Sequence, residues 1–411
     1  MRTVHPSIII GSYVWDQDRV PRDEFQIRIG GLHRVMDTNG WKAILVYGDA
    51  AEHSALAWFT AFTTRLRWGM ALIPREGEPR LLISMSSRDV PAMKLMTWIA
   101  DVVSGWNWES AFDPWLARIA GEGPIDIGSV GFELMRPPLF ESLRKSLGDR
   151  FRLHAADDVV AAVRTVRPRE RSQISAASRL VQTAAAAFIE PWRLGVGIET
   201  AALAAERTAR MAGAQDVRTL TSFDGGRTLA PFRGAFAPQA RVEDRMAGYI
   251  AVKYMGYWAD VFVTGLRRAK FAAGGDRAPA DYVREYARAQ ESFPVVQELA
   301  RRAQAGLRTL LSMAKPGVAA GALHAGATKA LGPHAPHPVL SGNVGRRIGL
   351  SLNEGGEITA DSRHTLAPGE VYSVHVGACD PQAGGALTSA MIAVTATGSE
   401  IIHLSPAPTV L

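Results

Sequence analysis

The amino-acid sequence predicts a mixed α/β (α+β) protein built from two domains. The chain has 411 residues, a length at which one hydrophobic core usually gives way to two. Its composition, 47% hydrophobic and 21% charged, is that of an ordinary globular protein and argues against disorder throughout. Runs with the periodicity of helices also alternate with runs typical of strands.

The first domain, residues 1–165, is predicted to mix helices and strands. Apolar residues recur at helical spacing in "DEFQIRIGGLHRVMDTNG", and Gly40 marks the end of that helix. The run "KAILVYGD" that follows predicts a short strand. In "WGMALIPREGEPRLLIS" two apolar runs flank a turn-forming stretch, which predicts a hairpin.

The second domain, residues 166–411, begins where the composition changes. Pro168 is predicted to open a long Ala-rich helix whose first turn includes Glu170. Further helices are expected in residues 194–213, 291–313 and 314–332. Strands are expected in "YMGYWADVFVTG", "RRIGLSLNEGG", "GEVYSVHVGACD" and "AMIAVTATGSEIIHLS".

Charge and cysteine content limit the partners. The 46 basic and 40 acidic residues give a net charge of +6, and the basic residues are dispersed rather than interleaved with aromatic ones, so no nucleic-acid partner is expected. No segment has the ~20 apolar residues of a membrane-spanning helix, and the N-terminal apolar run is too short for a signal peptide. A single cysteine, Cys379, allows no internal disulfide and suits a reducing compartment. We therefore expect a cytoplasmic protein with no membrane partner.

Several separate motifs agree on one family. The helix after "VRTVRPRERSQI", the "KPGV" at Lys315–Val318, "RRIGLSLNEGG", and "LAPGEVYSVHVG" followed by "IAVTATG" occur in a characteristic order and spacing. The chain resembles the creatinase, prolidase and aminopeptidase P family over nearly its whole length. The resemblance implies a creatinase-type N-terminal α/β domain, a pita-bread C-terminal domain, and a homodimer in which one N-terminal domain caps the partner's cavity.

The resemblance also assigns five metal-ligand positions, of which this sequence keeps one. In relatives a β-hairpin carries two metal-binding aspartates eleven residues apart, and a histidine and two glutamates complete the site. Asp260 aligns with the second aspartate. The other positions hold Tyr249, Arg346, His375 and Ser389. The His-Glu pair that follows in relatives reads Asn353-Glu354 here.

These replacements lead us to expect no dinuclear metal centre and no cofactor. Two divalent ions are held by several anionic oxygens, and an arginine among the ligand positions reverses the local field. A single ion on Asp260 and His375 would have only two protein ligands. Creatinase is the family's precedent for metal-free chemistry, but its general acid/base histidine aligns with Phe232, and its glutamate partners align with Phe262 and His375. Creatinase activity itself is therefore not transferred.

The remaining polar residues form a different candidate site. A histidine beside a carboxylate is a competent general acid/base, so His375, Asp260 and Glu354 are the catalytic candidates. Arg346 is the candidate anion binder. The other candidate substrate-binding residues are Asn353, Tyr257, Phe232, Arg233, Tyr249 and Ser389. Arg233 lies in "FDGGRTLAPFRG", a bent loop whose two arginines favour an anionic ligand.

Each candidate also has a purely structural interpretation. Asp260 could pair with Arg346 only to keep a buried charge neutral. His375 could be a satisfied residue of a buried strand, and Glu354, beside a Gly-Gly turn, could face solvent.

Three functional hypotheses follow. The first is a metal-independent, creatinase-like hydrolase that acts on a C–N bond of a small, anionic amide or amidine by His/carboxylate acid-base catalysis. The alternative is a catalytically silent pita-bread protein that binds a small molecule or a protein partner, and a second alternative is a residual metallopeptidase. The first two differ in whether Asp260, Arg346, Glu354 and His375 surround an open site or close on one another as paired ions.

Overall fold

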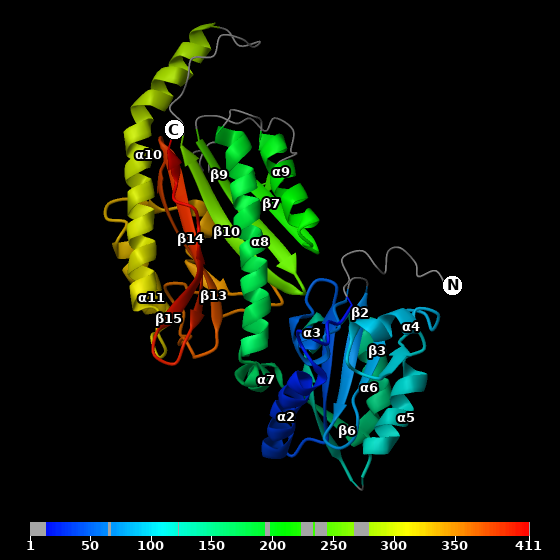
Figure 1. The fold of residues 1–411 in the computed structure, drawn as a ribbon. Coiled ribbons are helices and arrows are strands. Elements are labelled where there is room, and N and C mark those ends of the chain that lie inside the picture. The colour runs from blue at the N-terminus through cyan, green and yellow to red at the C-terminus, as the bar shows by residue number, and fades with distance from the viewer. Residues whose placement is uncertain are drawn as a thin grey trace. The chain divides into compact units, whose positions relative to one another are not determined.

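The computed structural model describes residues 14–64, 67–121, 123–193, 198–222, 233–234, 245–266 and 279–410. The chain divides into two compact units, Met1–Thr165 and Val166–Leu411. Both units contain helices and strands (Figure 1). The protein is therefore of the mixed α/β class that the sequence predicts.

The first unit is built on one mixed sheet of six strands in the order β4-β3-β2-β1-β5-β6. The strands are β1 (Ala43–Asp49), β2 (Trp68–Pro74), β3 (Arg80–Ile83), β4 (Asp101–Ser104), β5 (Ile125–Val130) and β6 (Phe151–Ala155). The α-helices are α2 (Arg22–Asn39), α3 (Ser54–Thr60), α4 (Val90–Met93), α5 (Glu109–Ile119), α6 (Pro137–Leu147) and α7 (Asp157–Val163). Short 3-10 turns are η1 (Lys94–Met96), η2 (Phe132–Leu134) and η3 (Gly148–Arg150).

Local sequence signals explain the element ends in this unit. Helix α2 ends because Gly40 adopts a left-handed conformation with φ of 72°, and its N–H bonds to the carbonyl of Met36. Strands β2 and β3 form the predicted antiparallel hairpin. Phe112 and Trp115 of α5 pack on β1 and β2 in the core of the unit.

The second unit contains two five-stranded sheets, one in the order β16-β10-β9-β7-β8 and one in the order β11-β13-β14-β15 with β12 beside β13. The first sheet comprises β7 (Asp216–Ser222), β8 (Arg233–Gly234), β9 (Arg245–Tyr254), β10 (Tyr257–Leu266) and β16 (Thr409–Val410). The second comprises β11 (Ala335–Pro336), β12 (Gly345–Arg347), β13 (Val371–Asp380), β14 (Gly384–Val394) and β15 (Ser399–Leu404).

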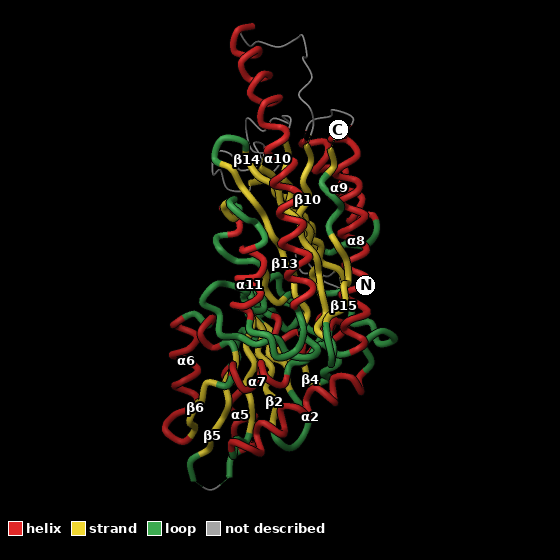
Figure 2. Tube along the Cα trace, turned by 90° about the vertical axis from the view of Figure 1, so that its left-hand side faces the viewer, coloured by secondary structure: helices red, strands yellow, loops and turns green. Residues whose placement is uncertain are grey.

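Helices cover the outer faces of both sheets, as Figures 1 and 2 show. Helices α8 (Pro168–Arg193) and α9 (Ile198–Met211) pack on the first sheet, and α10 (Pro279–Met313) packs on β13 and β14 with α11 (Ala320–Lys329) beside it. The short turn η4 (Pro338–Leu340) precedes β12. Within the described ranges no helix has both the length and the apolar character needed to cross a membrane.

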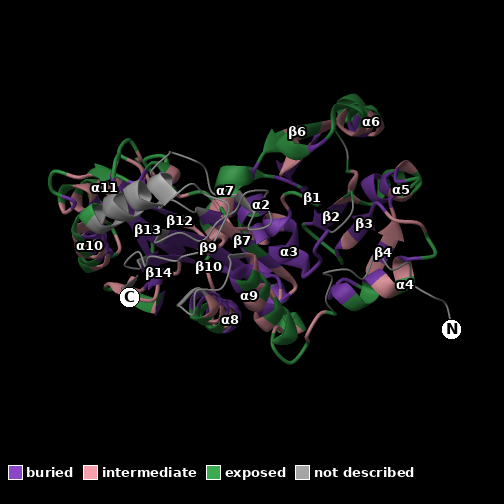
Figure 3. Ribbon diagram, turned by 90° about the horizontal axis from the view of Figure 1, so that it is seen from above, coloured by how far each residue is buried: buried purple, intermediate pink, exposed green. Residues whose placement is uncertain are grey.

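Strands β10 and β14 join the two sheets in the buried middle of the unit, and Figure 3 shows these strands coloured as buried. The Thr264 hydroxyl donates to the carbonyl of Leu387 at 2.8 Å and accepts from its N–H at 2.9 Å. The Ser389 hydroxyl accepts from the N–H of Phe262 at 2.9 Å. These contacts hold the hairpin β9–β10 against β14.

One strand prediction is wrong over most of its length. The sequence predicts a strand through "RRIGLSLNEGG", but β12 is short and the following residues form a loop. Gly355 and Gly356 have φ of 77° and 60°, which a strand does not allow. The Glu354 carboxylate also folds back onto the N–H groups of Leu350 and Ser351, so side-chain contacts replace strand pairing there.

Candidate functional site

The hairpin β9–β10 presents Tyr249, Asp260 and Phe262 on one face. Cross-strand pairing sets Phe262 opposite Tyr249 and Asp260 opposite Ala251, and side chains of alternate residues share a face. Tyr257 has the opposite parity, and its hydroxyl donates to Glu170 of α8 at 3.0 Å. The structure therefore does not bring Tyr257 to Asp260, because the pleat turns it toward the covering helix.

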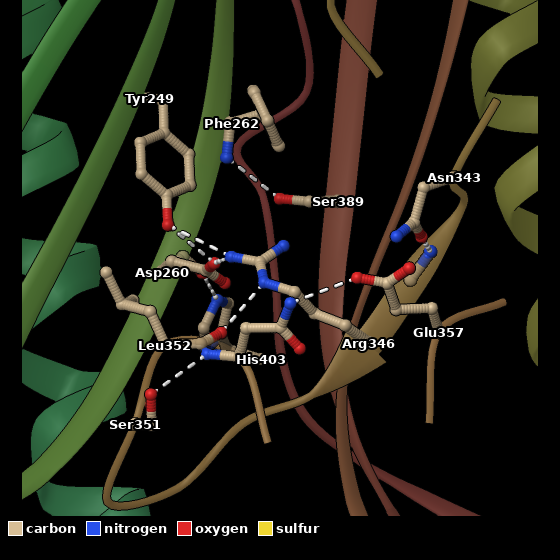
Figure 4. Close-up of polar contacts among 12 residues, drawn as sticks. Tyr249, Asp260, Phe262, Asn343, Arg346, Ser351, Leu352, Glu357, Ser389 and His403 are labelled. Atoms are coloured by element: carbon tan, nitrogen blue, oxygen red, sulfur yellow. Dashed lines mark hydrogen bonds and ion pairs between the residues drawn. The ribbon is translucent and has the colours of Figure 1, made fainter. Parts of the chain in front are cut away.

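Asp260 forms a buried ion pair with Arg346 (Figure 4). Arg346 Nη2 lies 2.6 Å from Asp260 Oδ2 and 3.2 Å from the Tyr249 hydroxyl. The Tyr249 hydroxyl donates to the same Oδ2 at 2.9 Å, and Arg346 Nε donates to the Leu352 carbonyl at 2.8 Å. Three of the five aligned ligand positions are thus joined in one hydrogen-bonded group.

The other two aligned positions lie on adjacent strands. His375 of β13 is paired with Ser389 of β14 in the sheet register. The Phe262 ring meets the His375 ring edge-on with centroids 5.5 Å apart, and Ser389 Oγ bonds to the Phe262 N–H. Phe262, on the hairpin that carries Asp260, therefore contacts both members of the His375–Ser389 pair.

Two buried polar atoms at this site have no hydrogen-bond partner among the residues that the structure describes. They are Oδ1 of Asp260, a residue that is 1% exposed, and Nδ1 of His375, which is 4% exposed. Buried polar atoms in native proteins nearly always have a partner, because each one left alone costs about 1–3 kcal/mol. A carboxylate oxygen and the unprotonated nitrogen of a neutral imidazole are both hydrogen-bond acceptors, so a donor group on a ligand would satisfy them.

Burial and the ion pair set the protonation of these groups. Burial lowers the pKa of His375 to about 4, the Arg346 charge adds to this shift, and Asp260 and the backbone of Asn343 oppose it. His375 is therefore neutral at pH 7. Burial and the Asp260 charge raise the pKa of Tyr249, so its hydroxyl remains a donor. Burial lowers the pKa of Arg346, but Asp260 and Tyr249 outweigh it, and the guanidinium stays charged.

A second histidine, which the sequence did not single out, holds the backbone at Asp260. His403 of β15 lies with Nε2 3.0 Å from the Asp260 carbonyl and Nδ1 2.6 Å from the Ser178 hydroxyl of α8. A carbonyl only accepts, so Nε2 carries the proton and Nδ1 accepts from Ser178. Burial lowers the pKa of His403, which favours this neutral form. The sequence signal was a histidine flanked by apolar residues in "IIHL".

Two further candidates lie in the loop after β12, outside this hydrogen-bonded group. Glu354 Oε1 accepts from the N–H groups of Leu350 and Ser351 at 2.8 and 3.2 Å. Asn353 is exposed and donates to Glu357 at 3.0 Å. Phe232 and the side chain of Arg233 lie outside the described residues.

The donor set at the aligned positions does not fit a two-metal site. Asp260 is the only carboxylate among the five, and the Arg346 guanidinium already occupies its Oδ2. Across the described parts of the chain, no group of three or more His, Cys, Asp or Glu side chains is arranged to hold a metal ion. Divalent ions require several such ligands.

Solved structures of similar fold are enzymes of one kind by their titles. A prolidase from Pyrococcus horikoshii OT3 has a TM-score of 0.70 at 18% identity, covering 92% of this chain and 99% of that chain. An X-Pro aminopeptidase from Thermotoga maritima MSB8 has a TM-score of 0.69 at 19% identity, with 93% and 99% covered. Dipeptidase PepE from Mycobacterium ulcerans has a TM-score of 0.69 at 16% identity, with 97% and 99% covered. At these identities the likeness establishes the fold.

The sequence itself matches one family. No curated protein matches the chain at a significant level. The profile of metallopeptidase family M24 matches residues 172–396, which is more than half of the chain and includes every aligned ligand position. The chain therefore belongs to metallopeptidase family M24.

Proposed function

We propose that this protein is a metal-independent hydrolase that acts on a C–N bond of a small amide or amidine. The observation that carries the proposal is the pair of buried, unpartnered atoms, Asp260 Oδ1 and His375 Nδ1. A buried site kept only for packing would be expected to satisfy or replace such atoms. A substrate and an attacking water with N–H and O–H donors would satisfy both.

Arg346 supports an anionic or carbonyl-bearing substrate. Its Nε and Nη2 are used by Leu352, Tyr249 and Asp260. No hydrogen bond of Nη1 is found within the described ranges, and Figure 4 draws this nitrogen without a partner. A guanidinium N–H held in place by three other hydrogen bonds of the same group is a preorganised donor for a substrate oxygen.

His375 is the proposed general base. The backbone of Asn343 binds the protonated ring nitrogen, which leaves the lone pair on Nδ1. Nδ1 takes a proton from a water molecule as its oxygen forms a bond to the amide carbon, and Arg346 Nη1 stabilises the negative charge on the substrate oxygen. The C–N bond then breaks, and the Nδ1 proton passes to the leaving nitrogen.

Asp260 is assigned to binding and orientation in this proposal. Its Oδ2 fixes Arg346, and its free Oδ1 accepts from a substrate N–H. Glu354, whose carboxylate already bonds to two backbone N–H groups, is assigned to shaping the loop beside the site. The positive charge that a metal would supply comes from the guanidinium.

The test is turnover of small amides, amidines and dipeptides by the intact protein and by His375→Asn. Removing a general base is expected to reduce turnover by about 10²–10⁴-fold. His334→Asn, which changes a partly exposed histidine outside the aligned positions, is the matched control and should keep full turnover. Equal turnover by His375→Asn and the intact protein would refute the assignment of the base.

A second candidate function is a binding protein without catalysis. It is favoured by the Asp260–Arg346 ion pair, which leaves His375 without a carboxylate partner. This candidate would be supported by a compound from the same panel that is never turned over but raises the melting temperature of the intact protein. The compound should not raise the melting temperature of an Arg346 variant.

A small-molecule substrate is the main partner that we propose. We also propose a homodimer, as the family resemblance implies, and a cytoplasmic location, which the single cysteine suits. Sedimentation at micromolar concentration would separate a dimer from a monomer of 44.3 kDa.

A further inference from the structure

A pocket of about 450 Å³ in the first unit is not used by the proposed reaction. Its lining includes Tyr47, Asp49, Arg67, Trp68, Ser84 and Arg136. This volume lies within the range of natural small-molecule sites, about 300–1,000 Å³.

The pocket lies at the edge of the sheet where β1, β3 and β5 end. Tyr47 and Asp49 are at the carboxyl end of β1, Ser84 follows β3, and Arg136 precedes α6, which comes after β5. Strand β2 is antiparallel to β1 and β3, and β5 is parallel to β1, so the three carboxyl ends meet at one edge (Figure 1). Ligands of open α/β sheets bind at this edge.

The charges of the pocket favour an anion. Arg67 and Arg136 are exposed, and neither has an ion-pair partner within the part of the chain that the structure describes. The single acid, Asp49, uses Oδ1 to accept from the N–H groups of Ala51 and Glu52 at 2.8 and 3.0 Å. Two cationic side chains therefore face one carboxylate that is already partly satisfied.

Neutral donors and an apolar wall complete the pocket. Tyr47 is 3% exposed and Ser84 is 5% exposed, and neither hydroxyl has a hydrogen-bond partner among the residues described. Burial and Asp49 raise the pKa of Tyr47 to about 12, so its hydroxyl remains a donor. The Trp68 ring stacks on Tyr47 with ring centroids 6.2 Å apart. Leu139 of α6 adds a second apolar side chain to the lining.

The first turn of α6 does not itself supply an anion site. Pro137 and Pro138 occupy its first positions and have no N–H groups to donate. The specific donors are therefore side chains.

We propose that this pocket binds a small organic carboxylate with a planar apolar body. The guanidinium groups of Arg67 and Arg136 hold the carboxylate, because planar N–H pairs match its two oxygens. The Tyr47 and Ser84 hydroxyls donate to the same head group, and Trp68 packs against the apolar body.

The test is calorimetric titration of the full chain with benzoate and, separately, with inorganic phosphate. Benzoate is expected to bind. Arg67→Gln and Arg136→Gln are each expected to weaken benzoate binding about tenfold, since a charge-assisted hydrogen bond contributes about that factor. Tyr47→Phe keeps the ring stack and is expected to weaken it about threefold. Arg118→Gln, an exposed arginine of α5 outside the pocket, is the matched control and should bind like the intact protein.

Three results would overturn the proposal. The first is that neither benzoate nor phosphate binds. The second is that benzoate binds equally well to Arg136→Gln and to the intact chain. The third is that phosphate binds but benzoate does not. Because Arg67 and Arg136 are exposed and lack ion pairs in the described residues, their substitution leaves the core intact. A thermal unfolding curve of each variant verifies this.

Discussion

Arg346 stands where the family resemblance expects a metal-binding imidazole, and its guanidinium bonds to the one carboxylate that remains. Its charge meets Oδ2 of Asp260 at 2.6 Å inside the protein, where Asp260 is 1% exposed. Each ion of a buried pair depends on the other, because an unpaired buried charge costs several kcal/mol. Arg346 therefore has a structural role as well as the proposed role in binding.

Arg346→Met should lower the free energy of unfolding by about 3–5 kcal/mol, because it leaves the Asp260 carboxylate buried without its cation. Urea denaturation of the full chain measures this. Adding Asp260→Asn should restore most of the loss, since the uncompensated charge is then removed. Arg308→Met, at an exposed position of α10, is the matched control and should change stability little. If Arg346→Met lowered the free energy of unfolding no more than this control, the result would contradict the stabilising role of the Asp260–Arg346 ion pair.

His375 should make the protein less stable in acid. Its pKa is about 4 in the folded chain and 6.5 as the ordinary value. Between these pH values the unfolded chain binds a proton that the folded chain does not, so the free energy of unfolding falls as pH falls from 6.5 to 4. The full loss of stability from His375, on the order of 3 kcal/mol, is reached near pH 4. Above pH 6.5 His375 causes no loss of stability.

His375→Asn removes this titration. Over the same interval its free energy of unfolding, from urea curves at several pH values, should decrease less than that of the intact protein. Arg346, Asp260 and the Asn343 backbone face position 375 in both proteins, so the difference between the two slopes isolates the titration of His375. Parallel slopes would contradict the low pKa.

At the scale of elements, the position of the site depends on how β10 lies against β14. Thr264 and Ser389 bridge the two strands by side-chain hydrogen bonds to backbone groups. Because Phe262 N–H is one of those groups, the bridge fixes the hairpin that carries Asp260. The covering helix contributes from the other face through Glu170 and Tyr257.

Thr264→Val should destabilise the protein by about 3 kcal/mol, because it leaves both the N–H and the carbonyl of Leu387 buried without this partner. Thr221→Val is the matched control: Thr221 is equally buried in the same sheet, but its hydroxyl has no hydrogen-bond partner in the described parts of the chain. That control should be neutral or slightly stabilising. Equal effects of the two substitutions in urea denaturation would contradict the bridging role.

The sequence predicts elements well where a local signal exists. Pro168 opens α8, Gly40 ends α2, and β13 lies within the strand predicted at "GEVYSVHVGACD". It fails at "RRIGLSLNEGG", because the loop is formed by glycine backbone angles and by Glu354 contacts that an apolar pattern does not encode.

At the scale of the whole molecule, residues distant in sequence form the site, and this limits sequence-based prediction. Spacing and resemblance indicate that Tyr249, Asp260 and Arg346 belong together, and the structure joins them. Ser178 and His403 are 225 positions apart and meet at the Asp260 carbonyl, for which no local pattern exists. The unpartnered Oδ1 and Nδ1 atoms are likewise visible only after folding.

The family membership and the donor set make opposite predictions for the whole protein. Family M24 is named for metallopeptidases, whereas an arginine and two hydroxyl side chains stand at three of this chain's five aligned positions. We propose that the guanidinium of Arg346 and the imidazole of His375 replace the metal chemistry.

The most direct measurement of that claim is the metal content of protein purified without chelator, together with turnover of the amide, amidine and dipeptide panel before and after chelation. We predict less than one divalent ion per chain and turnover that chelation leaves unchanged. About two ions per chain, with turnover that is lost on chelation and restored by a divalent metal, would contradict the claim and identify the protein as a metallopeptidase.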